Sequence, residues 1–198
     1  MKRIKKNFGM TMDKVFKLLG SHSNSERQKE DYYATDPAAL EALLNFESFS
    51  DVWECACGGG HLCGLLSKYG MLKRKSDIMD RGCGAEIFDF LNDFLNTEWN
   101  GDILTNPPYA NALEFVKKAL AIIPKGRKAA FLLRIQFLEG MERRALFNKE
   151  PPKYVYVFSK RALCAKNGDF NLQNGSAMCY AWFVWEKGFS GDTVIRWI

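Results

Sequence analysis

The sequence predicts an α/β fold in which helices flank a mostly parallel sheet, and three observations lead to this prediction. A predicted strand over residues 51–56 runs into a glycine triplet and then a helix over 61–69, which is the first half of a nucleotide-binding βαβ unit. Residues 129–133 are continuously apolar, as expected of a parallel strand that is covered on both faces. A short apolar strand over 103–105 ends abruptly at two consecutive prolines.

Length and composition favour one globular domain with a short extension. The chain has 198 residues, of which 47% are hydrophobic and 26% are charged, enough for a single full core. We expect a basic amphipathic helix and a linker over residues 1–30, followed by one domain over 31–198. The net charge of +5 suits a polyanionic partner but does not identify one.

The sequence does not favour a membrane or secreted protein. Its longest apolar run, 177–185, has nine residues, which is about half of a membrane span. Residues 10–19 are interrupted by charged side chains, so we expect no signal peptide and no membrane association. The six cysteines form no pattern of a secreted disulfide framework, which favours reduced thiols and a cytoplasmic location.

Four potential metal ligands lie close together in the sequence. Cys55, Cys57, His61 and Cys63 fall within nine residues. Structural zinc sites instead favour Cys pairs that are well separated along the chain. Cys55 and Cys57 are separated by only one residue on a predicted strand, and we expect no metal here.

The first helix of the domain has a recognisable start. Asp36 is suited to cap it and Pro37 to occupy its first turn. Leu40 and Leu43 then recur at helical spacing and define its inner face.

The glycine triplet, residues 58–60, allows close approach of the backbone to a ligand and positive φ angles. Glu54 lies at the end of the preceding strand. Asp77 follows Gly58 by 19 residues, close to the interval at which an acidic residue meets ribose hydroxyls in such folds. Asp80 is the alternative to Asp77 in this role, because the strand over 72–76 is polar and its end is uncertain from sequence.

Residues 86–88 form a predicted third strand, and an Asp-Phe pair follows it directly. Asp89 and Phe90 lie at the carboxyl end of this strand, which is the edge where such folds bind ligands, and are therefore the preferred pair. The same pair recurs at residues 93–94, and the choice between Asp89 and Asp93 stays open.

The chemistry centres on the segment that follows the strand over 103–105. Pro107 and Pro108 fix two φ angles and remove two N–H donors, so the strand ends in a stiff, extended tip. The side-chain oxygen of Asn106 and the carbonyl of Pro107 can accept both N–H bonds of a planar amine such as adenine N6. Tyr109 can stack on the flat ring that carries this amine.

Downstream, residues 113–120 have helical periodicity, and 154–158 and 178–185 are aromatic-rich strands. The segment between those strands, 159–176, is longer than a connection requires and carries basic and amide side chains. We therefore expect it to be a nucleic-acid recognition loop. Residues 194–198 are predicted to add an edge strand.

The Asn106–Tyr109 tetrapeptide, N-P-P-Y, resembles motif IV of the class I S-adenosylmethionine-dependent amino-methyltransferases. The segment 33–37 resembles motif X, with T-D-P where the family usually has T-P-P, and the C-G-G-G loop after Glu54 resembles motif I. The order of motifs is similar to that of adenine-N6 DNA methyltransferases, and the tail over 153–188 looks like the compact members found in phages and prophages.

This resemblance implies a Rossmann-like class I methyltransferase fold with a mostly parallel seven-stranded sheet and an antiparallel last strand. It implies S-adenosyl-L-methionine as cofactor and methyl transfer to adenine N6 in DNA; methylation of RNA adenine or protein glutamine, or a non-catalytic binding subunit, are the alternatives. A homodimer or partner subunit could supply sequence recognition. The implied cofactor-binding residues are Tyr33, Thr35, Glu54, Cys57, Gly58, Asp77, Asp89, Phe90 and Asn106, and the implied catalytic residues are Asn106, Pro107, Pro108 and Tyr109.

Overall fold

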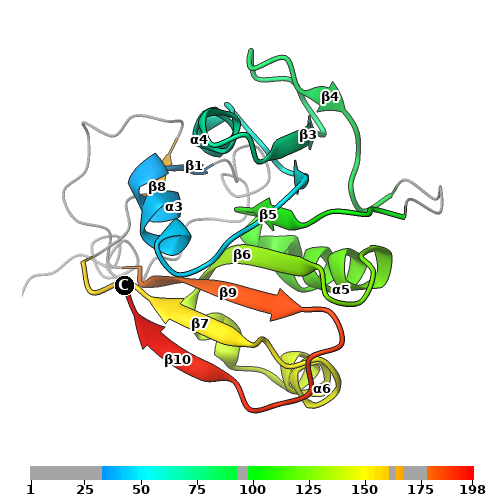
Figure 1. The fold of residues 1–198 in the computed structure, drawn as a ribbon, viewed down its shortest axis with the longest axis vertical. Helices are drawn as coiled ribbons and strands as arrows, with labels where there is room; N and C mark the ends of the chain where they lie inside the picture. Colours follow the sequence, from blue (N-terminus) through cyan, green and yellow to red (C-terminus); the bar gives the residue numbers. More distant parts are fainter. Residues whose placement is uncertain (1–32, 93–97, 161–163, 167–177) are drawn as a thin grey trace, which may run out of the picture. The chain divides into compact units, whose positions relative to one another are not determined.

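The structure is a computed structural model that describes residues 33–92, 98–160, 164–166 and 178–198 (Figure 1). Three features of the sequence analysis lie outside the described residues. They are the extension over 1–30, the alternative Asp-Phe pair at 93–94, and most of the predicted recognition loop over 159–176.

A single sheet of eight strands forms the centre of the described domain. The strands are β2 (Val52–Glu54), β3 (Leu72–Asp77), β4 (Glu86–Ile87), β5 (Ile103–Thr105), β6 (Lys128–Arg134), β7 (Tyr154–Val157), β9 (Tyr180–Glu186) and β10 (Val194–Trp197). Their order across the sheet is β10-β7-β9-β6-β5-β2-β3-β4, from bottom to top in Figure 1.

The strand directions confirm the predicted mostly parallel sheet. All neighbouring pairs are parallel except the two that involve β9, which runs antiparallel to both β6 and β7. The sheet has eight strands rather than the expected seven because the predicted edge strand, β10, pairs in parallel with β7.

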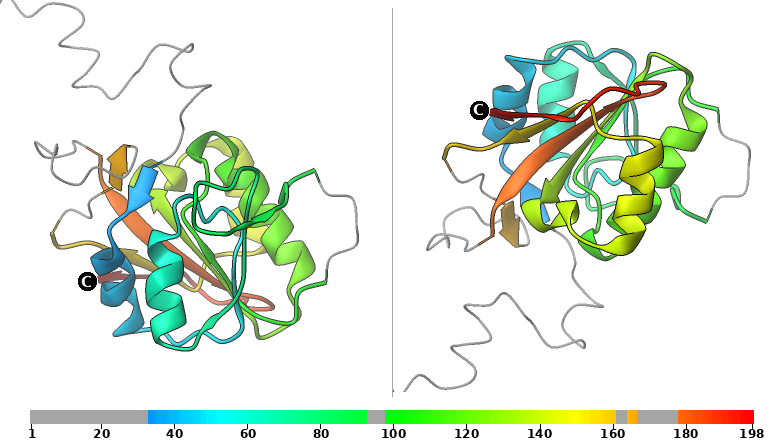
Figure 2. Two further views of the ribbon diagram at one scale, coloured as in Figure 1. Left: turned by 90° about the horizontal axis from the view of Figure 1, so that it is seen from above. Right: turned by 90° about the horizontal axis from the view of Figure 1, so that it is seen from below.

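Among the described residues, four α-helices cover the two faces of the sheet: α3 (Pro37–Leu44), α4 (His61–Lys68), α5 (Ala112–Ile122) and α6 (Met141–Lys149). Leu40 and Leu43 of α3 and Leu66 of α4 pack in one apolar cluster, whereas Val116 of α5 and Leu146 of α6 belong to a second cluster. The helices therefore form one layer on each side of the sheet, as Figure 2 shows.

The polar sequence of β3 has a structural explanation. The guanidinium of Arg74 lies 4.0 Å from the ring centroid of Trp53 and makes two hydrogen bonds of 2.8 Å to the carboxylate of Glu86. Arg74 therefore has an aromatic and an acidic partner near the edge of the sheet. These contacts explain how a strand without an apolar run pairs with β2.

A second, two-stranded sheet was not predicted from the sequence. β1 (Tyr33–Thr35) pairs antiparallel with β8 (Cys164–Lys166), so that Thr35 lies opposite Cys164. Residues 164–166 belong to the segment that we expected to be a recognition loop. Part of that segment, β8, therefore pairs with β1, the strand that contains Thr35 and directly precedes α3.

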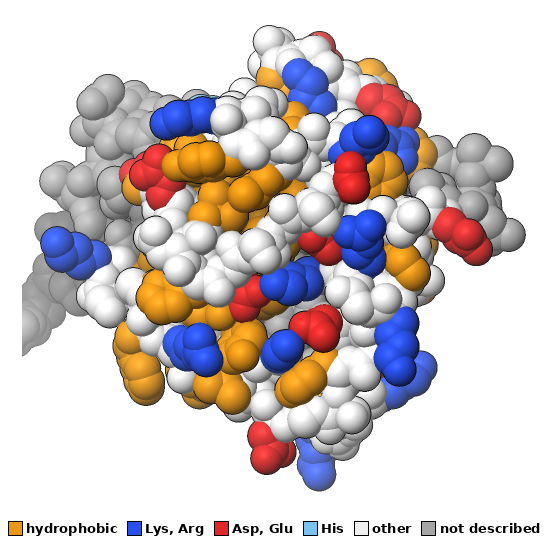
Figure 3. Space-filling view, in the orientation of Figure 1, with side chains coloured by type: hydrophobic (Ala, Val, Ile, Leu, Met, Phe, Trp, Pro, Cys, Tyr) orange, Lys and Arg blue, Asp and Glu red, His pale blue; other side chains and the backbone are white. Residues whose placement is uncertain are grey.

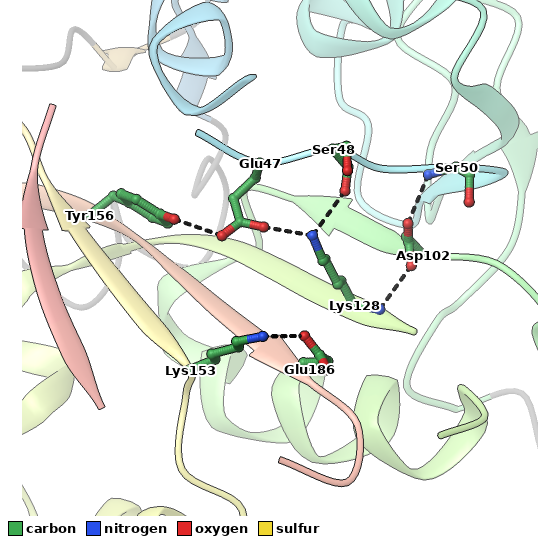
Figure 4. A network of polar contacts seen from close by, with 8 residues as sticks. All are labelled: Glu47, Ser48, Ser50, Asp102, Lys128, Lys153, Tyr156 and Glu186. Atoms are coloured by element: carbon green, nitrogen blue, oxygen red, sulfur yellow. Dashed lines mark hydrogen bonds and ion pairs between the residues drawn. The ribbon is translucent and has the colours of Figure 1, made fainter. Parts of the chain in front are cut away.

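A polar network supports the amino ends of the central strands (Figure 4). The buried carboxylate of Glu47 accepts hydrogen bonds of 2.6 Å from both the Lys128 ammonium and the Tyr156 hydroxyl. Burial and this hydrogen bond raise the pKa of the Tyr156 hydroxyl. Asp102 accepts from the backbone N–H groups of Ser50 and Lys128 at 2.7 and 2.8 Å. The network joins the loop before β2 to β5, β6 and β7.

On the face drawn in Figure 3, Lys and Arg side chains are interspersed with Asp and Glu side chains. This distribution agrees with the modest net charge of +5. None of the described helices is both long and apolar enough to cross a membrane.

Candidate functional site

The candidate site lies at the carboxyl ends of the parallel strands, which is the edge where α/β sheets bind ligands. Glu54 ends β2, Asp77 ends β3, and Asn106 directly follows β5. Because β2 lies between β3 and β5, these three residues come from adjacent strands of one sheet edge.

The glycine loop after β2 is tied to the end of β3. Gly58 and Gly60 have φ angles of 54° and 79°, which a residue with a side chain adopts at a cost. The backbone N–H of Gly58 donates to Asp77 Oδ2 at 2.8 Å. A Cβ atom at Gly60 would lie 2.8 Å from Cys83 Cβ, so glycine is also required there by packing.

Asp77 and Asp80 occupy different environments. Asp80 Oδ1 accepts from the backbone N–H groups of residues 82–85 at 3.0 to 3.3 Å, and the pKa of its carboxyl is lowered by these hydrogen bonds, that of Ala85 first. Its carboxylate therefore organises its own turn. The carboxylate of Asp77 lies instead against the glycine loop.

Glu54 is a buried acid beside the same loop. Only 2% of its surface is exposed, and the Cys63 thiol donates to its Oε2 at 2.8 Å. Burial raises the pKa of the Glu54 carboxyl to about 8. A cation that enters the site would favour the ionised form of this carboxyl.

The cysteines near the loop form a contact of their own. The Sγ atoms of Cys57 and Cys83 lie 3.8 Å apart, and the Cys83 thiol donates to the carbonyl of Gly58 at 3.4 Å. Within the described ranges, no cluster of three or more His, Cys, Asp or Glu residues is arranged to hold a metal ion.

The predicted Asp89–Phe90 pair follows β4, as expected, but its side chains have local and core contacts. Phe90 is 1% exposed, and its ring centroid lies 5.3 Å from that of Trp53 and 5.0 Å from that of Phe115. Asp89 accepts hydrogen bonds from the backbone of Leu91 and from backbone and side chain of Asn92. In this structure, the pair shapes the turn after β4, and its side chains make no described contact with the glycine loop.

The tip after β5 is held in place by β1. Asn106 Nδ2 donates to Thr35 Oγ1 at 2.9 Å, and the Thr35 side chain is buried. Pro107 is buried, and Pro108 precedes a short 3-10 helix, η1 (Tyr109–Asn111). The structure therefore brings together two residues that the sequence analysis placed in separate motifs. Tyr33 belongs to the same strand as Thr35.

The ring of Tyr109 lies in an aromatic and cationic setting that the sequence analysis missed. The Arg134 guanidinium carbon lies 4.7 Å from the Tyr109 ring centroid, and the ring of Tyr180 lies 5.6 Å away. Arg134 ends β6, the strand next to β5. Its only signal in the sequence was a basic residue at the end of an apolar strand.

Comparisons with known proteins find the fold but no close relative. Neither a family model nor a curated protein matches the sequence. Among solved structures, the chain is similar to a type I restriction-modification methyltransferase subunit from Streptococcus thermophilus, with a TM-score of 0.60 and 14% identity over 85% of this chain and 47% of that one. A modification subunit from Vibrio vulnificus, assigned to a type I restriction enzyme, has a TM-score of 0.56 and 12% identity over 94% of this chain and 51% of that one.

A Listeria monocytogenes protein assigned to the class I S-adenosylmethionine-dependent methyltransferases has a TM-score of 0.53 and 13% identity over 93% of this chain and 70% of that one. The architecture is thus the Rossmann-like fold of class I methyltransferases. The chain spans about half the length of the two restriction-modification subunits.

Proposed function

We propose that this protein transfers a methyl group from S-adenosyl-L-methionine to the exocyclic N6 amine of adenine in DNA. The observation that carries the proposal is the Asn106–Pro107–Pro108–Tyr109 tip at the carboxyl end of β5, with its amide held by Thr35. The tip stands in a fold shared with methyltransferases, at the edge of the sheet where such folds bind ligands.

The residues around the glycine loop fit this cofactor. The loop lets the backbone approach the ligand, and Asp77, anchored to Gly58, has the spacing of an acid that binds ribose hydroxyls. The buried Glu54 carboxyl suits the cationic amino group of the methionine part. The bound cofactor supplies a sulfonium-activated methyl group.

The chain's own residues would then prepare the acceptor. Asn106 Oδ1 and the carbonyl of Pro107 accept the two N–H bonds of the amine and direct its lone pair at the methyl carbon. Tyr109 fixes the plane of the base, and a base that was paired must first leave its helix. Positioning of the two reactants supplies most of the acceleration, and the amine needs no strong base because the proton that it loses on methylation passes to solvent.

The type I restriction-modification neighbours support a DNA substrate and a further subunit. The chain covers only about half of those subunits, so we propose that a second copy or a partner chain contributes to sequence recognition. We also propose that the protein acts in the cytoplasm. Its chain is proposed to divide into an extension over 1–30 and a single domain over 31–198.

The acceptor can be identified with a labelled methyl group. The protein is incubated with labelled S-adenosylmethionine and, in parallel, with unmethylated duplex DNA, total RNA and a protein extract. We expect label in DNA. Label in RNA alone or in protein alone would mean that this polymer, and not DNA, is the substrate. Cofactor binding without transfer to any acceptor would favour a non-catalytic subunit.

A further inference from the structure

Arg134 stands at the candidate site without a role in the chemistry described above. It ends β6 and lies directly opposite Tyr180 in the antiparallel register of β6 and β9. Its guanidinium stacks near the Tyr109 ring, at 4.7 Å from the centroid, and Tyr180 contacts the same ring. One cation and two aromatic rings therefore gather beside the tip, all within described parts of the chain.

One donor of the Arg134 guanidinium has no partner among the described residues. This donor, the Nε atom, is buried, and none of the ion pairs found between described residues involves Arg134. Buried polar groups in folded proteins are normally hydrogen-bonded, so the unpaired Nε atom requires an explanation, and a ligand at this edge of the sheet supplies one. A guanidinium presents a planar fork of donors that matches a phosphate or a carboxylate.

Two anions of the proposed reaction could occupy this position: a backbone phosphate of the substrate and the carboxylate of the cofactor. β6 is separated from β2, which carries the glycine loop, by β5, and neighbouring strands lie about 4.8 Å apart. Arg134 thus lies on the far side of the tip from the loop and beside Tyr109, the residue proposed to stack on the acceptor base. This placement favours the phosphate.

We propose that Arg134 binds a backbone phosphate next to the target nucleotide and so selects nucleic acid over a protein amide as the acceptor. The inference rests on the proposed function and deepens it. Stacking on Tyr109 leaves the edge of the guanidinium available for the phosphate, because a delocalised planar cation can stack and donate at the same time. The same contact holds the Tyr109 ring in a fixed plane when the phosphate is bound.

The test compares three variants with the wild-type chain. Arg134→Gln removes the charge, Arg134→Lys keeps the charge but loses the planar fork, and Arg144→Gln removes an exposed charge from α6, which packs on the opposite face of the sheet. Binding of a fluorescent unmethylated duplex is measured by anisotropy at several salt concentrations. Cofactor affinity and the kcat and KM of methyl transfer to DNA are measured for each variant.

We expect Arg134→Gln to weaken duplex affinity about tenfold and to lower the slope of log affinity against log salt by about 0.9, the value for one lost phosphate contact. Arg134→Lys should keep the slope and recover part of the affinity. Cofactor affinity should not change, and Arg144→Gln should leave both duplex affinity and slope as in the wild type.

Other outcomes overturn the inference in distinguishable ways. An unchanged slope together with a lower kcat would mean that Arg134 only holds the Tyr109 ring, and a loss of cofactor affinity would mean that it binds the cofactor carboxylate. An equal loss of duplex affinity in Arg144→Gln would mean that the effect of Arg134→Gln comes from the overall charge of the protein and not from a specific phosphate contact. If the wild-type protein methylated protein and neither bound nor methylated nucleic acid, both the proposed function and the inference would fail.

Discussion

The amide of Asn106 donates a hydrogen bond of 2.9 Å to the hydroxyl of Thr35, which lies 71 residues earlier in the chain. Thr35 is buried at the end of β1, and Asn106 begins the tip after β5. The contact fixes the plane of the amide whose oxygen is proposed to accept the reacting amine. It gives a positioning role to a strand that lies outside the central sheet.

Loss of the Thr35 hydroxyl should therefore slow methyl transfer. We expect Thr35→Val to lower kcat about fivefold, because one neutral hydrogen bond contributes about 1 kcal/mol. Thr35→Ser, which keeps the hydroxyl, should retain most of the activity. Steady-state kinetics with DNA and direct titration of the cofactor distinguish a role in positioning Asn106 from a role in cofactor binding. Weaker cofactor binding with unchanged kcat would mean that Thr35 binds the cofactor instead.

The environments of Asp77 and Asp80 predict different effects on cofactor binding. Asp77→Asn should weaken binding tenfold or more, since a hydrogen bond to a charged group contributes about 1.5–3 kcal/mol. Asp80→Asn, the matched control, should leave affinity unchanged because Asp80 holds only its own turn. Calorimetric titration of both variants measures this, and the reverse result would exchange their roles.

Cofactor affinity should depend on pH through Glu54. Below its pKa of about 8, the buried carboxyl is mostly protonated in the unliganded protein, and a cationic amino group must displace that proton. Affinity should rise up to about tenfold per pH unit from about pH 6 and level off above about pH 8. Glu54→Gln should bind the cofactor more weakly, and its affinity should not depend on pH in this range. If the affinity of the variant changed with pH as that of the wild type does, another group would be responsible for the titration.

The same raised pKa affects the stability of the unliganded protein. The folded state favours the protonated carboxyl, so this contribution is fully present below the unfolded pKa of about 4.5 and is lost as the pH rises through about 8. In thermal unfolding, Glu54→Gln should gain stability relative to the wild type as the pH increases over this interval. A constant difference at every pH would contradict the assignment.

The Glu47–Lys128 pair should contribute more to folding than the Lys153–Glu186 pair (Figure 4). Glu47 is 6% exposed at its side chain, whereas both side chains of the second pair are 32% exposed. Lys128→Met leaves a buried carboxylate with one hydrogen-bond partner fewer and should cost about 2 kcal/mol in urea unfolding. Lys153→Met should cost less than about 1 kcal/mol, and equal costs would mean that burial does not distinguish the pairs.

The structural features that were predictable from sequence are those that depend on local patterns. The glycine loop, the double proline after β5 and the spacing of Asp77 each depend on a few consecutive residues or a fixed interval. The polar strand β3 and the edge strand β10 were also placed correctly. Their partners in the sheet follow from chain order and the parallel topology.

The parts that were missed depend on contacts between distant segments. The pairing of β1 with β8 joins residues about 130 positions apart, and three-residue strands have too little pattern to indicate a partner. Arg134 reaches the site only because β6 lies beside β5 and β9. The burial of Phe90 against Trp53 likewise depends on packing that an Asp-Phe pair alone does not encode.

The central claim is that the tip methylates adenine N6, and nucleoside analysis of reacted DNA tests it most directly. Unmethylated duplex DNA is incubated with S-adenosylmethionine and either the wild-type protein or Asn106→Ala, then digested to nucleosides and measured by mass spectrometry. We predict N6-methyladenine with the wild type and a loss of at least a hundredfold with Asn106→Ala, with cofactor affinity nearly unchanged in the variant. Full activity of Asn106→Ala, or a methyl group on another base, would contradict the account.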